Sequence, residues 1–224
     1  MVEPLDGDIV DSILKLSPLV VYGEQGVGRT IFLYQLAFSL LHRDFNVFFL
    51  TSDISYRVIK SYLRIATDFY TPRIYVFAEF SLSDRIRCLT DVLEDIIMSS
   101  PSKVSIIFDD FLPTHIQLSR MIDETTSCSI AKLLFWLNFL ARSKFCYPIV
   151  CSVLENTKSS LPFKARFYRS YGFNFLRIYK ISRIRIFRKS IIPGERVGQE
   201  DQEDLGMAII TNNGFIFEKT KATS

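Results

Sequence analysis

Cysteine and histidine are scarce in this 224-residue sequence. Its 2 histidines cannot form a histidine-rich metal site, and its 4 cysteines have neither C-x-x-C nor zinc-finger spacing. We therefore exclude a zinc module and a disulfide framework, and we expect reduced, buried thiols. The cysteines are Cys88, Cys128, Cys146 and Cys151.

Long hydrophobic runs and a strong excess of one charge are also missing. No apolar run approaches the roughly 20 residues that a membrane-spanning helix needs. Acidic residues within positions 3–11 lead us to expect neither a secretory nor a transit peptide. The net charge of +3 names no partner by itself, whereas a hydrophobic content of 48% is enough for a packed core.

Apolar strand-like runs alternate with segments of helical period over the first two thirds of the chain. This alternation predicts an α/β fold with a mainly parallel sheet and helices on both faces. The predicted strands are 17–22, 46–51, 73–78, 104–108 and 148–153, and the predicted helices are 28–42, 56–67, 82–99 and 130–143.

The pattern changes after residue 173, where no helix signal is found. Residues 207–211 and 215–218 flank the turn sequence Asn212-Asn213-Gly214, which predicts a hairpin. We expect one domain over residues 1–224. It would have a short N-terminal extension at 1–16 and antiparallel strands at 173–224, added to the edge of the sheet.

A glycine-rich stretch lies between the first predicted strand and the first predicted helix. It reads Gly23-Glu24-Gln25-Gly26-Val27-Gly28-Arg29-Thr30 and matches the P-loop pattern G-x-x-x-x-G-K-[ST] at every defined position except Arg29. The glycines allow successive backbone N–H groups and a helix N-terminus to face a phosphate. We therefore predict that these eight residues bind ATP and that the Thr30 hydroxyl holds Mg²⁺.

Arg29 stands where the P-loop pattern has lysine. Arginine is wider, planar and forked, so it keeps the charge but displaces it. A displacement of about 1 Å can cost about 100-fold in rate. We expect nucleotide binding with weak or no hydrolysis, and the alternative is a loop that remains only as structure.

Two carboxylates follow predicted strands. Asp109 ends the apolar strand 104–108, where a Walker B aspartate orders Mg²⁺ through water beside the P-loop threonine. Asp110 could serve instead, and a turn-capping role is the structural alternative. Asp53 follows strand 46–51 and could orient an attacking water as a catalytic residue, although an isolated aspartate there is more often a helix N-cap.

The segment 155–172 interleaves basic and aromatic residues, which is the composition of a single-strand-binding segment. Docking of its aromatic side chains on the domain or on a partner is an equal alternative. The DNA-binding candidates are Lys158, Lys164, Arg166, Tyr168 and Arg169. Further basic residues extend this positive strip, each expected on a solvated strand face: Arg177, Lys180, Arg183, Arg185, Arg188 and Lys189.

The order of these features resembles the core ATPase domain of the RecA/RadA-type recombinases, and especially their small, degenerate paralogues. The resemblance covers residues 17–218 and is most specific at the P-loop; residues 106–109 match the family's Walker B strand. Asp53 falls where the family has a catalytic glutamate. Val153-Leu154 replaces a polar sensor, so the resemblance implies weakened coupling of the nucleotide to DNA.

The resemblance implies an accessory paralogue rather than a filament-forming recombinase. Only 16 residues precede the first predicted strand, and no Phe-x-x-Ala polymerisation motif precedes the core. Such paralogues pair with another paralogue or the main recombinase, sometimes in Shu-type complexes. Such paralogues help to assemble the main recombinase on single-stranded DNA in homologous recombination and DNA repair.

Two other functions remain open. One is an active DNA-dependent or KaiC-like ATPase with arginine in place of the P-loop lysine, and the other is a protein-interaction module with an empty P-loop. The resemblance implies a nuclear location if the chain is eukaryotic and a cytoplasmic one if it is archaeal.

Overall fold

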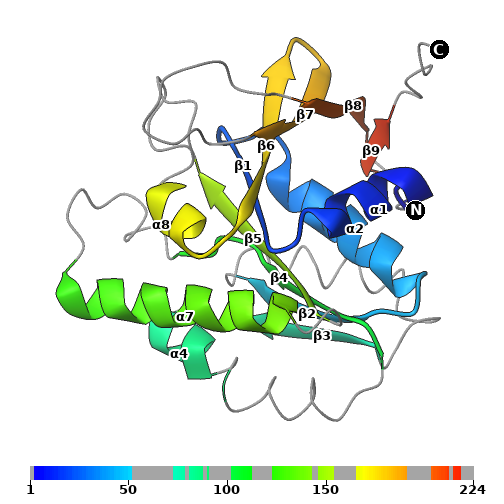
Figure 1. Cartoon of the computed structure of the whole chain (residues 1–224). Coiled ribbons are helices and arrows are strands. Elements are labelled where there is room, and N and C mark those ends of the chain that lie inside the picture. Colours follow the sequence, from blue (N-terminus) through cyan, green and yellow to red (C-terminus); the bar gives the residue numbers. More distant parts are fainter. Residues whose placement is uncertain are drawn as a thin grey trace.

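The computed structural model describes residues 3–51, 73–78, 81–87, 90, 102–112, 123–142, 146–153, 165–190, 203–211 and 214–217. These residues form one nine-stranded sheet with helices on both faces (Figure 1). Its strands are β1 (Leu19–Gly23), β2 (Asn46–Thr51), β3 (Ile74–Ala78), β4 (Val104–Phe108), β5 (Cys146–Val153), β6 (Asn174–Ile181), β7 (Ile184–Ser190), β8 (Glu203–Thr211) and β9 (Gly214–Phe217).

The strand order is β3-β2-β4-β5-β1-β6-β7-β8-β9. All pairs from β3 to β6 are parallel, and β6 to β9 are joined antiparallel. The predicted hairpin is confirmed as β8–β9. The expectation of antiparallel strands from residue 173 needs one correction, because β6 is parallel to β1 on one side and antiparallel to β7 on the other. The chain returns from the carboxyl end of β5 to the amino end of the sheet before β6 begins, which sets this direction.

Two helices, α1 (Gly7–Lys15) and α2 (Arg29–Leu41), cover one face of the sheet; the opposite face carries α4 (Leu82–Arg87), α7 (Glu124–Arg142) and α8 (Ala165–Ser170) (Figure 1). Along α7, Leu133, Leu137 and Leu140 form a buried stripe at helical spacing. In α2, nine of the residues between Phe32 and Leu41 are buried. Near-complete burial fits its position between the sheet and α1.

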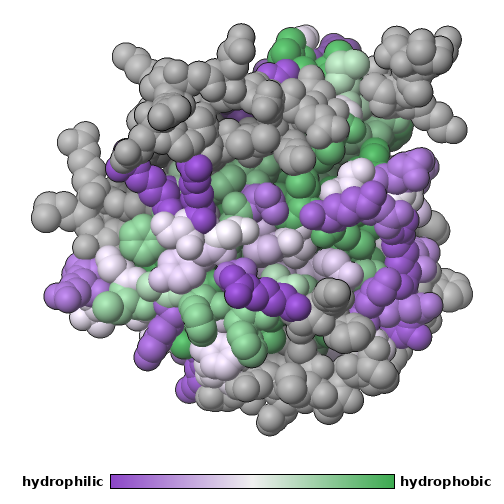
Figure 2. Space-filling view, viewed as in Figure 1, coloured by the Kyte–Doolittle hydropathy of each residue, from purple (hydrophilic) through white to green (hydrophobic). Residues whose placement is uncertain are grey.

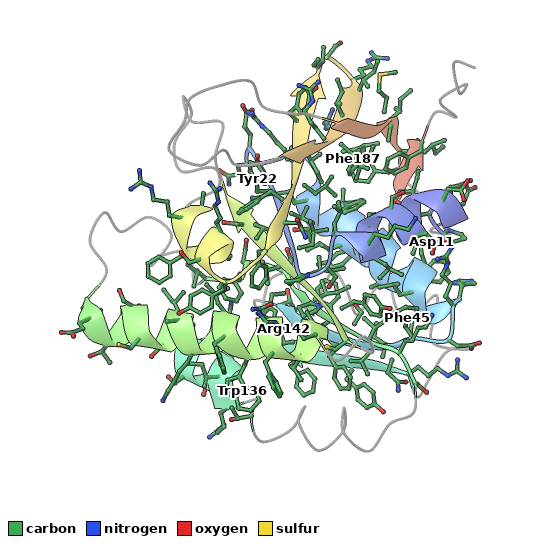
Figure 3. The ribbon with its side chains drawn as sticks, in the orientation of Figure 1. Asp11, Tyr22, Phe45, Trp136, Arg142 and Phe187 are labelled. Carbon is green, nitrogen blue, oxygen red and sulfur yellow. The ribbon has the colours of Figure 1, made fainter. Side chains whose placement is uncertain are left out.

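The core divides into one cluster on each face of the sheet. On the face of α2, the ring centroids of Phe32 and Phe187 lie 4.9 Å apart, and Phe187 is labelled in Figure 3. On the other face, Phe108 packs edge-on against Phe111. Trp136 lies on the side of α7 where α4 is found (Figure 3). No helix in the described ranges is long and apolar enough to cross a membrane.

Several predicted boundaries change in the structure. Helix α7 begins at Glu124 instead of residue 130. At this start, the Asp123 carboxylate accepts a hydrogen bond from the Thr126 N–H at 2.8 Å. The predicted N-terminal extension contains α1, which begins after the N-cap Asp6. Residues 165–170, which belong to no predicted helix, form α8. The predicted helix 56–67 lies outside the described residues, as does most of the predicted helix 82–99 after Arg87.

The thiols differ in their surroundings. Burial raises the pKa of Cys146 to about 12, so this side chain is an uncharged member of the core. Cys128 is exposed on α7, so the expectation of a buried thiol is wrong there. The side chains of Cys88 and Cys151 lie outside the description.

One side chain of α2 bonds to the outer edge of the sheet at β9. Gln35 is 1% exposed. Its Oε1 accepts the Phe215 N–H at 2.7 Å, and its Nε2 donates to the Phe215 carbonyl at 2.8 Å and to the Glu3 carbonyl at 2.9 Å. The Gln35 amide therefore takes the place of a further strand and also attaches the N-terminal segment.

We expect Gln35→Leu to lower the free energy of unfolding by about 2–4 kcal/mol, because it leaves the buried Phe215 N–H and carbonyl without their partner. Urea unfolding without nucleotide measures this. Lys132→Ala, on the exposed face of α7, is the control and should change stability by less than about 0.5 kcal/mol. Equal stability of the two variants would contradict the role given to Gln35.

Candidate nucleotide site

The predicted P-loop joins the end of β1 to the start of α2. Gly26 and Gly28 have φ angles of 77° and 99°, in the left-handed region that glycine adopts without strain. Gly28 is the N-cap of α2, and no side chain of the described residues caps this helix. The first N–H groups of α2 therefore have no side-chain cap, which is the arrangement that binding of an anion at a helix N-terminus requires.

The C-terminal strands press directly against this loop. A Cβ atom on Gly23 would lie 2.3 Å from the Ile178 carbonyl oxygen of β6. A Cβ atom on Gly28 would lie 2.7 Å from Ile210 Cδ1 and 2.9 Å from Phe215 Cζ. The two glycines are thus required by close packing against β6, β8 and β9 as well as by the shape of the loop.

Thr30 and Asp109 meet as the sequence predicts. The Thr30 hydroxyl donates to Asp109 Oδ1 at 3.1 Å, and Asp109 is 2% exposed. The Asp109 N–H also donates to the Leu50 carbonyl at 2.9 Å, which fixes the residue at the end of β4. A hydroxyl and a carboxylate are oxygen ligands of the kind that Mg²⁺ uses beside phosphate, so these two side chains fit that ion.

The described residues hold no other metal site made of three or more His, Cys, Asp or Glu side chains. A magnesium ion at Thr30 and Asp109 would take further ligands from water and phosphate, as Mg²⁺ usually does.

The neighbouring Asp110 has a different role, in the turn that follows β4. Its φ is 60°, and its backbone carbonyl accepts a hydrogen bond from Nη1 of Arg85 in α4. The same nitrogen donates to the Phe111 carbonyl at 2.5 Å, and Arg85 is 3% exposed. This buried arginine holds the turn after β4, and only Asp109 of the two aspartates is bonded to Thr30.

Arg29 is directed toward β5. Its Nη1 donates to the carbonyl oxygen of Ser152, which lies beside Tyr22 in the parallel pair β1–β5. The charge that the P-loop pattern would place among phosphates is thus bonded to a backbone oxygen near the carboxyl end of the neighbouring strand.

A second arginine contacts the P-loop from the C-terminal strands. Arg185 of β7 is 8% exposed, and its Nε donates to the Val27 carbonyl at 3.0 Å. The expectation that Arg185 lies on a solvated strand face is therefore wrong, because its side chain turns inward to the loop. Neither Arg85 nor Arg185 was predicted to belong to the site, since their acceptors are backbone carbonyls that leave no mark in the sequence.

The DNA-binding candidates are only partly described. Arg166 and Arg169 are exposed on α8. Tyr168, in contrast, is 1% exposed, with its ring centroid 5.6 Å from that of Phe111 and 5.9 Å from that of Phe173. The hypothesis that Tyr168 stacks on bases is therefore corrected, because its ring belongs to the core. Asp53, Lys158 and Lys164 lie outside the described residues.

Comparison with known proteins identifies the architecture. No family model and no curated protein sequence matches the chain. A crystal structure of the RadB recombinase superposes with a TM-score of 0.61 at 16% identity, covering 92% of this chain and 94% of that one. The solved ATPase domain of a helicase gives a TM-score of 0.57 at 12% identity, covering 88% of this chain and 83% of that one. The chain has a RecA-like P-loop ATPase fold.

This likeness confirms the predicted fold class, a RecA-like core with a largely parallel sheet and antiparallel strands at the C-terminal edge. At such low identity it shows the fold alone.

Asp109→Asn tests the predicted magnesium site. We expect it to weaken Mg²⁺–ATP binding about tenfold and to leave metal-free ATP binding unchanged, because only the charge facing the cation is removed. Calorimetric titration of the protein with ATP, once in MgCl₂ and once in EDTA, measures the affinity for Mg²⁺–ATP and for metal-free ATP. Asp110→Asn is the matched control and should bind as the wild type does; an equal loss in both variants would remove Asp109 from the metal site.

Proposed function

We propose that this RecA-like chain is an accessory recombinase paralogue that binds Mg²⁺–ATP and hydrolyses it slowly or not at all. With another paralogue or the main recombinase, it would help to assemble or stabilise that recombinase on single-stranded DNA in homologous recombination and repair. The observation that carries nucleotide binding is the hydrogen bond between Thr30 and the buried Asp109, at the start of a helix without a side-chain cap.

Backbone N–H groups of the loop 23–30 would hold the phosphates, and Thr30 and Asp109 would hold Mg²⁺. The ion would neutralise phosphate charge, which is its ordinary contribution at such sites. None of these contacts uses the Arg29 side chain, so binding would not require it.

Slow hydrolysis is supported by the position of Arg29. Its guanidinium would have to leave the Ser152 carbonyl to reach a phosphate. A cation that is not already placed gives less stabilisation of the charge that develops during phosphoryl transfer. The shorter Asp53 in the place of a catalytic glutamate argues in the same direction.

A protein partner is supported by the outward face of α7. Phe135 and Phe139, one turn apart, are 58% and 57% exposed, and Figure 2 shows apolar side chains between polar ones on this side of the molecule. Lys132 and Arg142 flank them on the same face. Large exposed apolar groups with a polar rim are typical of protein interfaces. A nuclear location in a eukaryote, or a cytoplasmic one in an archaeon, follows from the proposed role.

Thermal unfolding with and without Mg²⁺–ATP tests the proposal first. A ligand at 100 times its Kd adds about 2.7 kcal/mol to the stability of the folded state. For a domain of this size we expect the Tm to rise by roughly 5–10 °C. No rise would favour the interaction module with an empty P-loop, and a turnover of about 1 s⁻¹ or more would favour the active ATPase instead.

Direct contact with DNA is tested by replacing the two exposed cations of α8. Arg166→Ala with Arg169→Ala should weaken binding of a single-stranded oligonucleotide and lower the salt slope by about 1.4, since each phosphate contact on a single strand contributes about 0.7. Fluorescence anisotropy at several salt concentrations measures the slope. An unchanged slope would assign DNA contact, if any, to other parts of the complex.

A further inference from the structure

We propose that Arg185 is a positioning residue of the nucleotide site, which holds the Val27 carbonyl so that the Gly28 N–H faces the phosphate side of the P-loop. This inference rests on the proposed binding of nucleotide. It assigns to the C-terminal strands a part in binding that the P-loop pattern alone does not contain.

The orientation follows from the geometry of one peptide unit. Arg185 Nε donates to the Val27 carbonyl oxygen at 3.0 Å. Within the described residues the cis peptide bond is Ser17–Pro18, so the Val27–Gly28 peptide is trans. The carbonyl and the N–H of a trans peptide point to opposite sides of the chain. With its carbonyl turned toward β7, this peptide directs the Gly28 N–H away from β7.

That direction is useful for binding an anion. Gly28 is the N-cap of α2 with a φ of 99°, and glycine has no side chain that would hinder rotation of its peptide units. If the Val27–Gly28 peptide turned over, the carbonyl oxygen would replace the N–H and repel a phosphate. The hydrogen bond from Arg185 opposes this turn, because it would lose a buried, charge-assisted partner.

The charge of Arg185 supports the same role. Its two other hydrogen bonds, from Nη1 to the carbonyls of Arg183 and Ile184, are longer, at 3.4 Å. Neither ion pair found in the described part of the chain includes it, and its cross-strand neighbours are Lys180 and Ala208. Within the described residues this buried cation is bonded to carbonyl dipoles alone, which is costly for folding, but it adds positive potential directly behind the proposed phosphate loop.

A purely structural role would make the same hydrogen bond, so the test must separate affinity from stability. We would measure Mg²⁺–ATP affinity by calorimetry for the wild type, Arg185→Met and Arg185→Lys. Arg183→Met is the matched control, because this exposed arginine lies two residues away and its loss removes the same charge from the same hairpin. Urea unfolding without nucleotide would report the stability of each variant.

We expect Arg185→Met to weaken Mg²⁺–ATP binding at least tenfold and Arg183→Met to change it by less than twofold. Arg185→Lys, which keeps a charge and a donor, should recover part of the affinity. When the wild type and the variants are ranked by Mg²⁺–ATP affinity, the ranking should differ from that by free energy of unfolding.

A spectroscopic measurement keeps the proposal falsifiable if Arg185→Met does not fold. Labelling valine with ¹³C at the carbonyl and glycine with ¹⁵N selects two peptide units, Val27–Gly28 and Val197–Gly198. In the wild type, Mg²⁺–ATP should shift the Gly28 amide proton downfield, as a hydrogen bond to phosphate does. In Arg185→Lys this shift should be smaller.

The outcomes separate the two proposals. If the wild type does not bind Mg²⁺–ATP, the proposed function fails. If the wild type binds but the Arg185 variants bind equally well and show the same Gly28 shift, nucleotide binding stands and the positioning role of Arg185 is overturned.

Discussion

Close packing between the P-loop and the C-terminal strands is the constraint on which the site depends. The β6 backbone leaves no room for a side chain at residue 23, and the β8–β9 hairpin leaves none at residue 28. The hairpin is in turn fixed by Gln35, which also binds the Glu3 carbonyl. Three parts of the chain that are distant in sequence therefore determine the shape of an eight-residue loop, and neither β1 nor α2 could impose that shape alone.

Under the proposed function, the same arrangement would separate binding of a nucleotide from its hydrolysis. The Thr30–Asp109 pair and the N–H groups of α2 would act on the bound state without the side chain at residue 29. Lysine or arginine at that position matters most where charge develops during phosphoryl transfer. Arg29 is already bonded to the Ser152 carbonyl near the end of β5. The absence of its charge from the phosphates would therefore lower the rate of hydrolysis more than the affinity for nucleotide.

The sequence predicted the buried parallel strands best. The bounds of β2 and β4 were predicted to the residue, because strands covered on both faces are continuous apolar runs with polar residues at each end. The P-loop and the meeting of Thr30 with Asp109 could also be predicted, since both strands end at the same edge of a parallel sheet. Helix α8 could not, because six residues rich in arginine and aromatic side chains carry too little helical period.

The wrong prediction for Arg185 shows why the antiparallel strands were harder to predict from the sequence. Side chains in a strand alternate between faces, so Arg185 shares a face with Phe187, while Ile184 and Ile186 share the other. Both faces carry apolar residues, and the sequence alone does not say which of them meets α2. Phe187 packs on Phe32 of that helix, and this contact brings the arginine inward with it. The alternation of the strand thus places a cation behind the P-loop, although nothing in the sequence marks its backbone acceptor.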